Sequence, residues 1–169
     1  MFYVCFSVVV AGVAMVMDLN NARVDNGWLL FSLGLGVIVR CMDCDWRGFL
    51  LGAAGGIFPL MLLGCFFSFH MLGAGDIKLF CVLGTLLGIK DVGKCMIVSF
   101  FLGAVFSFAI LLSTGDVFAR FYYLFCYIRE FMQTGVKKPY CQNGVSAPEN
   151  FHFTVPVFLS IVLFAGGVY

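Results

Sequence analysis

The chain has 169 residues, of which 62% are hydrophobic and only 11% are charged, and its mean hydropathy is +1.04. A soluble domain of this length could not bury so much apolar side chain, so the composition predicts a polytopic helical membrane protein. The net charge of +1 indicates no nucleic-acid partner, because such a partner requires a clustered basic face.

Apolar runs separated by short polar loops predict an all-α protein with about six transmembrane helices in a single domain, residues 1–169. The expected spans cover residues 2–17, 27–39, 48–69, 77–89, 95–113 and 154–169. The second run reaches the length of a span if its helix extends into the loops and Arg40 snorkels. The third run contains Pro59, a candidate kink, and several glycines, which let membrane helices approach closely. These glycines include Gly52, Gly55, Gly56 and Gly64.

Residues 116–132 differ from the spans, because their apolar side chains recur at helical spacing among charged residues such as Asp116 and Arg120. This pattern predicts an amphipathic helix between the fifth and sixth spans, either lying at the membrane interface or continuing the fifth span. Residues 133–150 are polar and rich in turn formers, and they predict a loop.

The N-terminal run is interpreted as a retained first span, since no basic region precedes it and no cleavage signature lies near Met17. Four of the 8 cysteines, Cys5, Cys65, Cys81 and Cys95, lie within apolar runs, where they behave as small hydrophobic residues. Cys41 and Cys44 form one C-x-x-C pair, but a structural zinc site needs a second pair or matching histidines. The sequence therefore favours unpaired loop thiols and no metal.

Two aspartates lie at the edges of apolar runs, where an ionisable residue is a functional hypothesis by default. Asp18 follows the first run, and Asp76 precedes the fourth. If the second and third runs both cross, the two aspartates lie on the same membrane face. Two adjacent carboxylates cannot both ionise easily, so one would act as a base toward water and the other as an acid toward a carbonyl oxygen. That is the chemistry of an aspartic protease, and it requires no metal or cofactor.

The segment Gly73-Ala74-Gly75-Asp76 has two interpretations. Its glycines would permit backbone conformations and close approaches to Asp76 that side chains forbid. Alternatively, the segment is a flexible turn in which Asp76 caps the next helix. Lysines and arginines divide six to four between the two sets of loops, which weakly favours a cytoplasmic position for both aspartates. The larger set comprises Arg23, Lys78, Arg120, Arg129, Lys137 and Lys138.

Two blocks of the chain resemble the type IV prepilin peptidases, the Gly-x-Gly-Asp aspartic proteases of bacterial and archaeal pilin-like precursors. The first block is Asp18 followed by Val24-Asp25-Asn26, where the family has an aspartate and a hydrophobic-Pro-Asn element. The second is Gly73-Ala74-Gly75-Asp76-Ile77-Lys78, which matches the family's Gly-x-Gly-Asp-x-Lys in full. The layout of six spans and the proline of the last span, Pro156, are also similar.

The resemblance implies an intramembrane endopeptidase that removes the leader of a prepilin-like substrate at the cytoplasmic face of the inner membrane. Asp18 and Asp76 would be its catalytic pair. Its expected partners are that substrate and the lipid bilayer, while the sequence leaves the oligomeric state open.

The resemblance also assigns supporting positions. Gly73 and Gly75 would shape the site, and Lys78 would be a supporting cation at the membrane face. Asn26 matches a family position without a role that the residues define. Asp25 replaces the family's proline, so a different local turn is expected. Larger members carry an N-terminal region with paired C-x-x-C motifs and N-methylation activity, whereas this chain resembles the short, peptidase-only forms.

Two other functions stay open at this point. A small proton-coupled carrier would use Asp18 and Asp76 as a proton relay but would place ionisable residues near the middle of a span. A non-catalytic assembly subunit would hold the two aspartates apart. Neither histidine is expected in the site: His70 is interpreted as interfacial, and His152 as solvated or interfacial.

Overall fold

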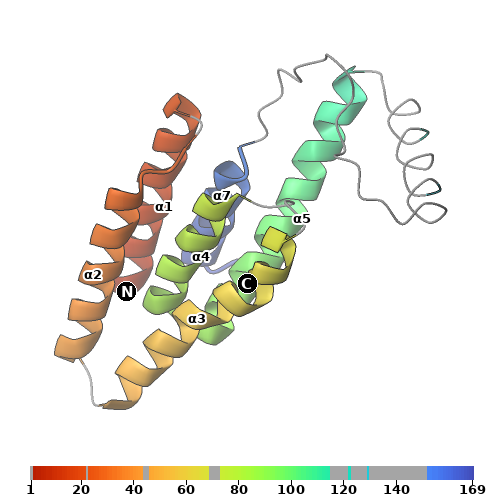
Figure 1. Ribbon diagram of the computed structural model, residues 1–169. Helices are drawn as coiled ribbons and strands as arrows, with labels where there is room; N and C mark the ends of the chain where they lie inside the picture. Colours follow the sequence, from red (N-terminus) through yellow and green to blue (C-terminus); the bar gives the residue numbers. More distant parts are fainter. Residues whose placement is uncertain are drawn as a thin grey trace. The chain divides into compact units, whose positions relative to one another are not determined.

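The computed structural model describes residues 2–21, 23–43, 46–68, 73–114, 122, 129 and 152–169. In this part of the chain all regular structure is helical, which confirms the all-α part of the predicted fold class (Figure 1). The helices are α1 (Phe2–Asn21), α2 (Asn26–Asp43), α3 (Trp46–Ser68), α4 (Ala74–Leu87), α5 (Ile89–Thr114) and α7 (Thr154–Ala165).

The chain divides into two compact units, one formed by Met1–Gly103 with His152–Tyr169 and the other by Ala104–Phe151. The first unit carries both aspartates. The loop 133–150, His70 and Cys44 lie outside the described residues. So does the predicted amphipathic helix 116–132, except for positions 122 and 129, which are both helical.

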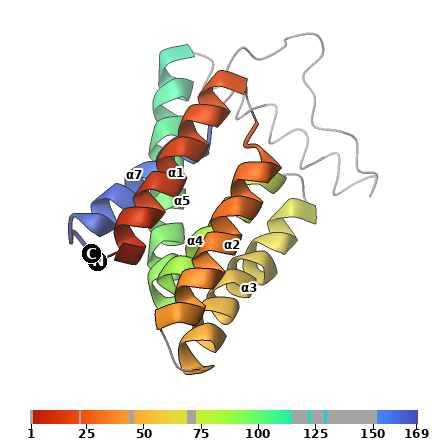
Figure 2. The same cartoon turned by 90° about the vertical axis from the view of Figure 1, so that its left-hand side faces the viewer.

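Consecutive helices of the first unit alternate in direction. Figure 2 shows α2 beside α3, and α1 beside α7, in agreement with the contacts between these pairs. Helix α4 packs against α1, α2 and α3. Its side chains Leu79, Phe80 and Leu83 are fully buried and form the centre of the core. The fourth apolar run, residues 77–89, therefore forms most of the central helix of this unit.

Helix α5 begins earlier than the sequence indicated. The expected spans 77–89 and 95–113 left residues 90–94 as a loop. That prediction is wrong, because Lys90, Asp91 and Lys94 all lie in the first turns of α5. Gly88 ends α4 with a φ of +88°, a conformation that favours glycine, and the next helix starts at once. Asp91 is placed favourably at the positive end of α5 and lies 3.5 Å from the Lys94 ammonium.

Glycines bring α3 and α4 into backbone contact, as the sequence predicted. A Cβ atom at Gly55 would collide with the backbone carbonyl of Gly84, and a Cβ at Gly84 would collide with the carbonyl of Gly55. Pro59 has no N–H to donate to the Gly55 carbonyl, so this oxygen is released from the helical ladder where it faces α4. At Gly64, by contrast, no close approach exists among the described residues.

Helix α2 also packs on α4 and is longer than the apolar run suggested. Near its end, the Arg40 guanidinium donates from Nη2 to the Leu86 carbonyl over 2.8 Å and lies 4.7 Å from the centre of the Tyr3 ring. The last carbonyls of a helix lack intrahelical partners, so Arg40 satisfies one of them at the end of α4. A Cβ at Gly36 would lie 3.0 Å from the Leu86 side chain, which accounts for the close approach of the two helices.

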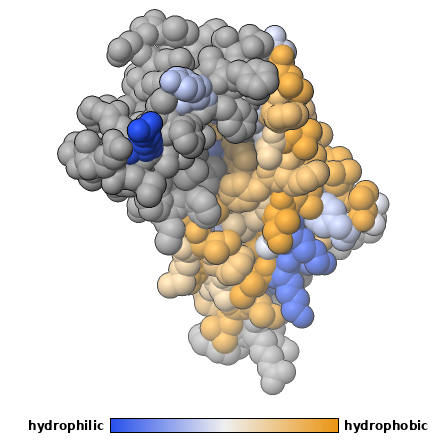
Figure 3. All heavy atoms as spheres, turned by 90° about the vertical axis from the view of Figure 1, so that its right-hand side faces the viewer, coloured by the Kyte–Doolittle hydropathy of each residue, from blue (hydrophilic) through white to orange (hydrophobic). Residues whose placement is uncertain are grey.

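Two helical segments, Phe2–Asn21 and Ile89–Ile110, are long and apolar enough to cross a membrane. Three shorter apolar helices accompany them: Asn26–Cys41, Gly48–Gly64 and Thr154–Ala165. Large apolar side chains are exposed, including Met61 at 77% and Ile97 at 73%. Figure 3 shows broad apolar surface on one face of the molecule. This exposure suits contact with lipid, while the six-span topology stays a prediction.

Candidate active site

Three helix ends carry the predicted site residues, and a fourth carries a histidine that the sequence analysis placed outside the site. Asp18 lies in the last turn of α1, and Asn26 begins α2. Asp76 lies in the first turn of α4, one turn before the apolar core of that helix. His152 lies just before α7 and contacts Asp18. The helices therefore bring chemistry-bearing residues together from positions far apart in the sequence.

Asp76 is held at the start of α4 by the segment that precedes it. Gly73 is the N-cap residue, and its backbone amide donates a hydrogen bond to the Asp76 carboxylate. This is one half of a capping box, in which the third helical residue reaches back to the N-cap amide. The capping interpretation of Asp76 is thus supported, and it does not exclude chemistry at the same carboxylate.

Asp76 is also electrostatically coupled to Asp18. Burial raises the pKa of Asp76, the negative charge of Asp18 raises it further, and the Gly73 hydrogen bond opposes both effects. The net result is a pKa of about 6. A carboxyl group with such a pKa carries a proton under mildly acidic conditions, when ordinary aspartates are ionised. The charge of Asp18 therefore reaches the carboxyl group of Asp76, as an acid–base pair requires.

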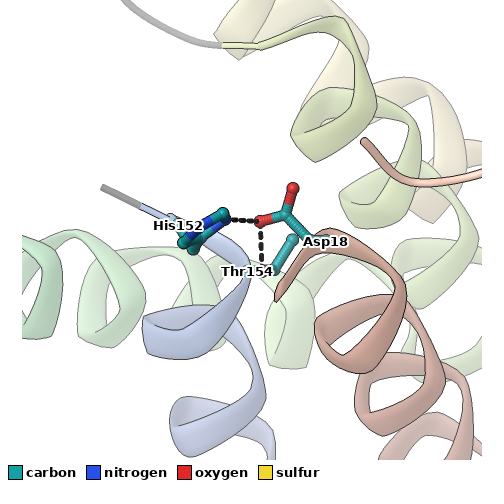
Figure 4. A network of polar contacts seen from close by, with 3 residues as sticks. All are labelled: Asp18, His152 and Thr154. Carbon is teal, nitrogen blue, oxygen red and sulfur yellow. Dashed lines mark hydrogen bonds and ion pairs between the residues drawn. The ribbon is translucent and has the colours of Figure 1, made fainter. Parts of the chain in front are cut away.

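Asp18 is held by two donors that the sequence did not reveal (Figure 4). Its Oδ2 atom accepts a hydrogen bond from the Thr154 hydroxyl over 2.7 Å and lies 3.1 Å from Nδ1 of His152. The interpretation of His152 as a merely solvated or interfacial residue is wrong, because its ring is only 23% exposed and bonds Asp18. No sequence signal marks this contact, since 134 residues separate the two side chains.

The two glycines of the motif differ in how closely other atoms approach them. A Cβ at Gly73 would lie 3.2 Å from Oδ2 of Asp76, so the absence of a side chain at Gly73 leaves space for the carboxylate. The backbone at Gly73 has a φ of −69°, which any residue can adopt, so the expected conformational role is wrong there. A Cβ at Gly75 would meet Val24 at 3.7 Å, an ordinary contact distance. Only Gly73 is therefore sterically restricted by the site.

Lys78 and Asn26 form a direct link between α4 and α2. The Lys78 ammonium donates to Oδ1 of Asn26 over 2.8 Å. Asp25, at the position where the resemblance led us to expect proline, caps α2 by accepting a hydrogen bond from the Gly27 amide over 3.2 Å. Asn26 thus has a structural role that its sequence position alone did not define.

Among the described residues, no group of three His, Cys, Asp or Glu side chains is placed to hold a metal ion. Of the C-x-x-C pair, Cys41 is a free, exposed thiol.

The protein is helical, and at one end of its core a buried aspartate is electrostatically coupled to a second aspartate. This is the type of site expected of an aspartic peptidase, and the sequence comparisons point to the same class. Residues 5–112 match the type IV leader peptidase family, and the chain belongs to this family. The match includes Asp18 and Asp76 and ends before His152 and Thr154. The resemblance seen in the two sequence blocks is thereby confirmed.

The chain is similar to the prepilin leader peptidase/N-methyltransferase of Bacillus subtilis (strain 168), with 33% identity over 107 residues. The aligned part covers 62% of this chain and 42% of that protein, so the chain matches less than half of the relative's length. No solved structure matches the chain.

Proposed function

We propose that the protein is an intramembrane aspartic endopeptidase that removes the leader peptide of prepilin-like precursors, with Asp18 and Asp76 as its catalytic pair. The observation that carries this proposal is the coupling of the two carboxylates, through which the charge of Asp18 raises the pKa of Asp76. Membership of the type IV leader peptidase family and the similarity to a prepilin leader peptidase support the choice of reaction.

The proposed reaction proceeds through water activated between the two carboxyl groups. One carboxylate takes a proton from the water, and the resulting hydroxide attacks the carbonyl carbon of the scissile peptide bond. The other carboxyl group donates its proton to the carbonyl oxygen, which gives a tetrahedral diol. The diol then collapses as its C–N bond breaks, and a proton passes to the leaving amine.

The proposed place of the reaction is the cytoplasmic face of the inner membrane, which the protein would span several times. Its two membrane-length helices and its exposed apolar side chains support contact with lipid. Asp18 and Asp76 lie at helix ends rather than near mid-helix. This position suits cleavage at the junction between a polar leader and an apolar segment of the substrate, and it does not favour a proton relay through a carrier.

The test is a processing assay in which the chain is co-expressed with prepilin-like precursors from its own genome. Asp18→Asn and Asp76→Asn are each compared with Asp91→Asn, a control that removes a carboxylate paired with Lys94 on α5. We expect a leader-sized mobility shift with the wild type and the control, and none with either site variant. Cleavage that survives Asp18→Asn or Asp76→Asn in a protein with verified insertion would contradict the role of that residue. Absence of cleavage of every precursor by the inserted wild type would favour a non-catalytic assembly subunit.

A further inference from the structure

We propose that His152 and Thr154 are positioning residues that hold Asp18 as the anionic base of the pair and leave Asp76 to carry the proton as the acid. This inference rests on the proposed function. It assigns the role of base to one carboxyl group and that of acid to the other, which the sequence could not distinguish.

The first support is the way in which Asp18 is bound. Both donors approach the same carboxylate oxygen, Oδ2, from the segment that opens α7. The Thr154 residue is 1% exposed, and the Asp18 side chain is 14% exposed. Water therefore competes little for these hydrogen bonds, and the geometry is held by two packed helices.

The second support is the chemistry of the donors. An ionised carboxylate only accepts hydrogen bonds, so an anionic Asp18 requires the proton of His152 to be on Nδ1. The Thr154 hydroxyl donates to the same oxygen. Hydrogen bonds donated to a carboxylate favour its charged form. Thr154 is also the first residue of α7, and the positive end of a helix favours a nearby anion.

The third support is the contrasting environment of Asp76. Burial is the largest effect on this carboxyl group and favours its neutral form, while the Gly73 amide supplies the opposing hydrogen bond. The other charged or titratable groups near this end of the described helices are Arg23, Asp25, Lys78 and His152. Of the charged groups, Asp18 is the one that shifts the pKa of Asp76. Carboxyl groups whose environments differ in this way take different roles in acid–base catalysis.

The bound geometry leaves one oxygen of Asp18 available. In Figure 4 the second carboxylate oxygen points away from His152 and Thr154. Among the described residues, no hydrogen-bond donor contacts this Oδ1 atom. It is the atom assigned to the nucleophilic water, while Oδ2 serves as the anchor.

The kinetic test compares disruptive and conservative changes at the two donors, Thr154 and His152. Thr154→Val removes the hydroxyl at nearly constant volume, whereas Thr154→Ser keeps it. His152→Ala removes the ring, whereas His152→Asn keeps a donor near the position of Nδ1. We expect Thr154→Val and His152→Ala to lower kcat about 10- to 100-fold, the range for losing a hydrogen bond to a charged group, with KM nearly unchanged. The conservative variants should recover most of the rate.

The pH dependence separates positioning from a general structural defect. Loss of a donor to the base should move the acidic limb of the kcat/KM profile to higher pH in Thr154→Val, and Thr154→Ser should restore it. An equal loss of rate at every pH, or no loss of rate in Thr154→Val while Asp18→Asn is inactive, would overturn the inference and leave the proposed function intact.

A second measurement does not depend on activity. Protein labelled with ¹³C at aspartate carboxyl groups is titrated in detergent by NMR, and the signals of Asp18 and Asp76 are assigned from their Asn variants. We expect the chemical shift of the Asp18 carboxyl carbon to change in Thr154→Val, which lacks the hydroxyl donor, and to return to the wild-type position in Thr154→Ser. An unchanged signal would overturn the inference. The expected shift in a protein that cleaves no precursor would support the inference and count against the peptidase.

Discussion

The negative charge of Asp18 acts on Asp76 across two different helices and, together with burial, brings the pKa of Asp76 to about 6. The two residues lie in the last turn of α1 and the first turn of α4. Because neither carboxyl group has this environment in the unfolded chain, their interaction makes the stability of the fold depend on pH.

Asp76→Asn should therefore stabilise the protein more at pH 7 than at pH 4. The folded-state pKa of about 6 lies above the ordinary value of 3.8, so the folded state binds the proton more tightly. That contribution to stability is complete below about pH 4 and is lost as the pH rises through 6. The difference amounts to at most about 3 kcal/mol, which the neutral asparagine avoids.

The measurement is the free energy of unfolding of wild type and Asp76→Asn in detergent at several pH values. Asp91→Asn serves as the control, since it lies on α5 in an exposed ion pair with Lys94. If the gap between wild type and Asp76→Asn is the same at pH 4 and pH 7, the raised pKa is refuted.

Gly73→Ala and Gly75→Ala form a matched pair within the motif. The new Cβ at position 73 would lie 3.2 Å from Oδ2 of Asp76, whereas at position 75 it would meet Val24 at 3.7 Å. We expect Gly73→Ala to displace the carboxylate and lower kcat at least about tenfold, because catalytic geometry tolerates little displacement. Gly75→Ala should have a much smaller effect. Rate assays on both inserted variants decide the matter, and equal losses would contradict the steric argument.

Gly84→Ala should destabilise the packing of α3 on α4 by several kcal/mol, because its Cβ would collide with the backbone carbonyl of Gly55. The control is Gly34→Ala on α2, where a Cβ would meet no described atom within 4 Å. That change should be neutral or stabilising by about 0.5–1 kcal/mol through helix propensity. Thermal unfolding in detergent compares the two, and similar melting temperatures would show that the glycine contact is not restrictive.

The Lys78–Asn26 hydrogen bond is expected to make a small contribution to the free energy of unfolding. Both side chains are exposed, so a double-mutant cycle of Lys78→Met and Asn26→Ala should give a coupling energy of about 0.5–1 kcal/mol in unfolding. Because the link lies near Asp76, the same cycle in the processing assay should also be non-additive. Strict additivity in both measurements would mean that the 2.8 Å contact does not persist in solution.

Local pattern was sufficient to predict much of this molecule. Apolar runs predicted the helical class, and the glycines at 55 and 84 flank the contact that brings α3 onto α4. The aspartates were selected because charge at the edge of an apolar run is costly and therefore informative. The start of α5 was missed because three charged residues were interpreted as a loop, although they are placed well in the first turns of a helix.

Tertiary pairing could not be predicted in the same way. The His152–Asp18 and Lys78–Asn26 contacts join residues separated by 134 and 52 positions. No periodicity or spacing encodes such distances, because they depend on which helix ends meet. A lone histidine before an apolar run gives the same signal whether it is solvated or bonded to a carboxylate.

The two polar contacts between α2 and α4 also limit how the protein can move. One joins Asn26 to Lys78 at the start of both helices, and the other joins Arg40 to the Leu86 carbonyl at their ends. A sliding motion of α2 along α4 would break both contacts at once, so the two contacts together oppose that motion. The Asn26–Lys78 contact is exposed and the Arg40 contact is part-buried, so the helix starts next to Asp76 are the less restrained end of this pair.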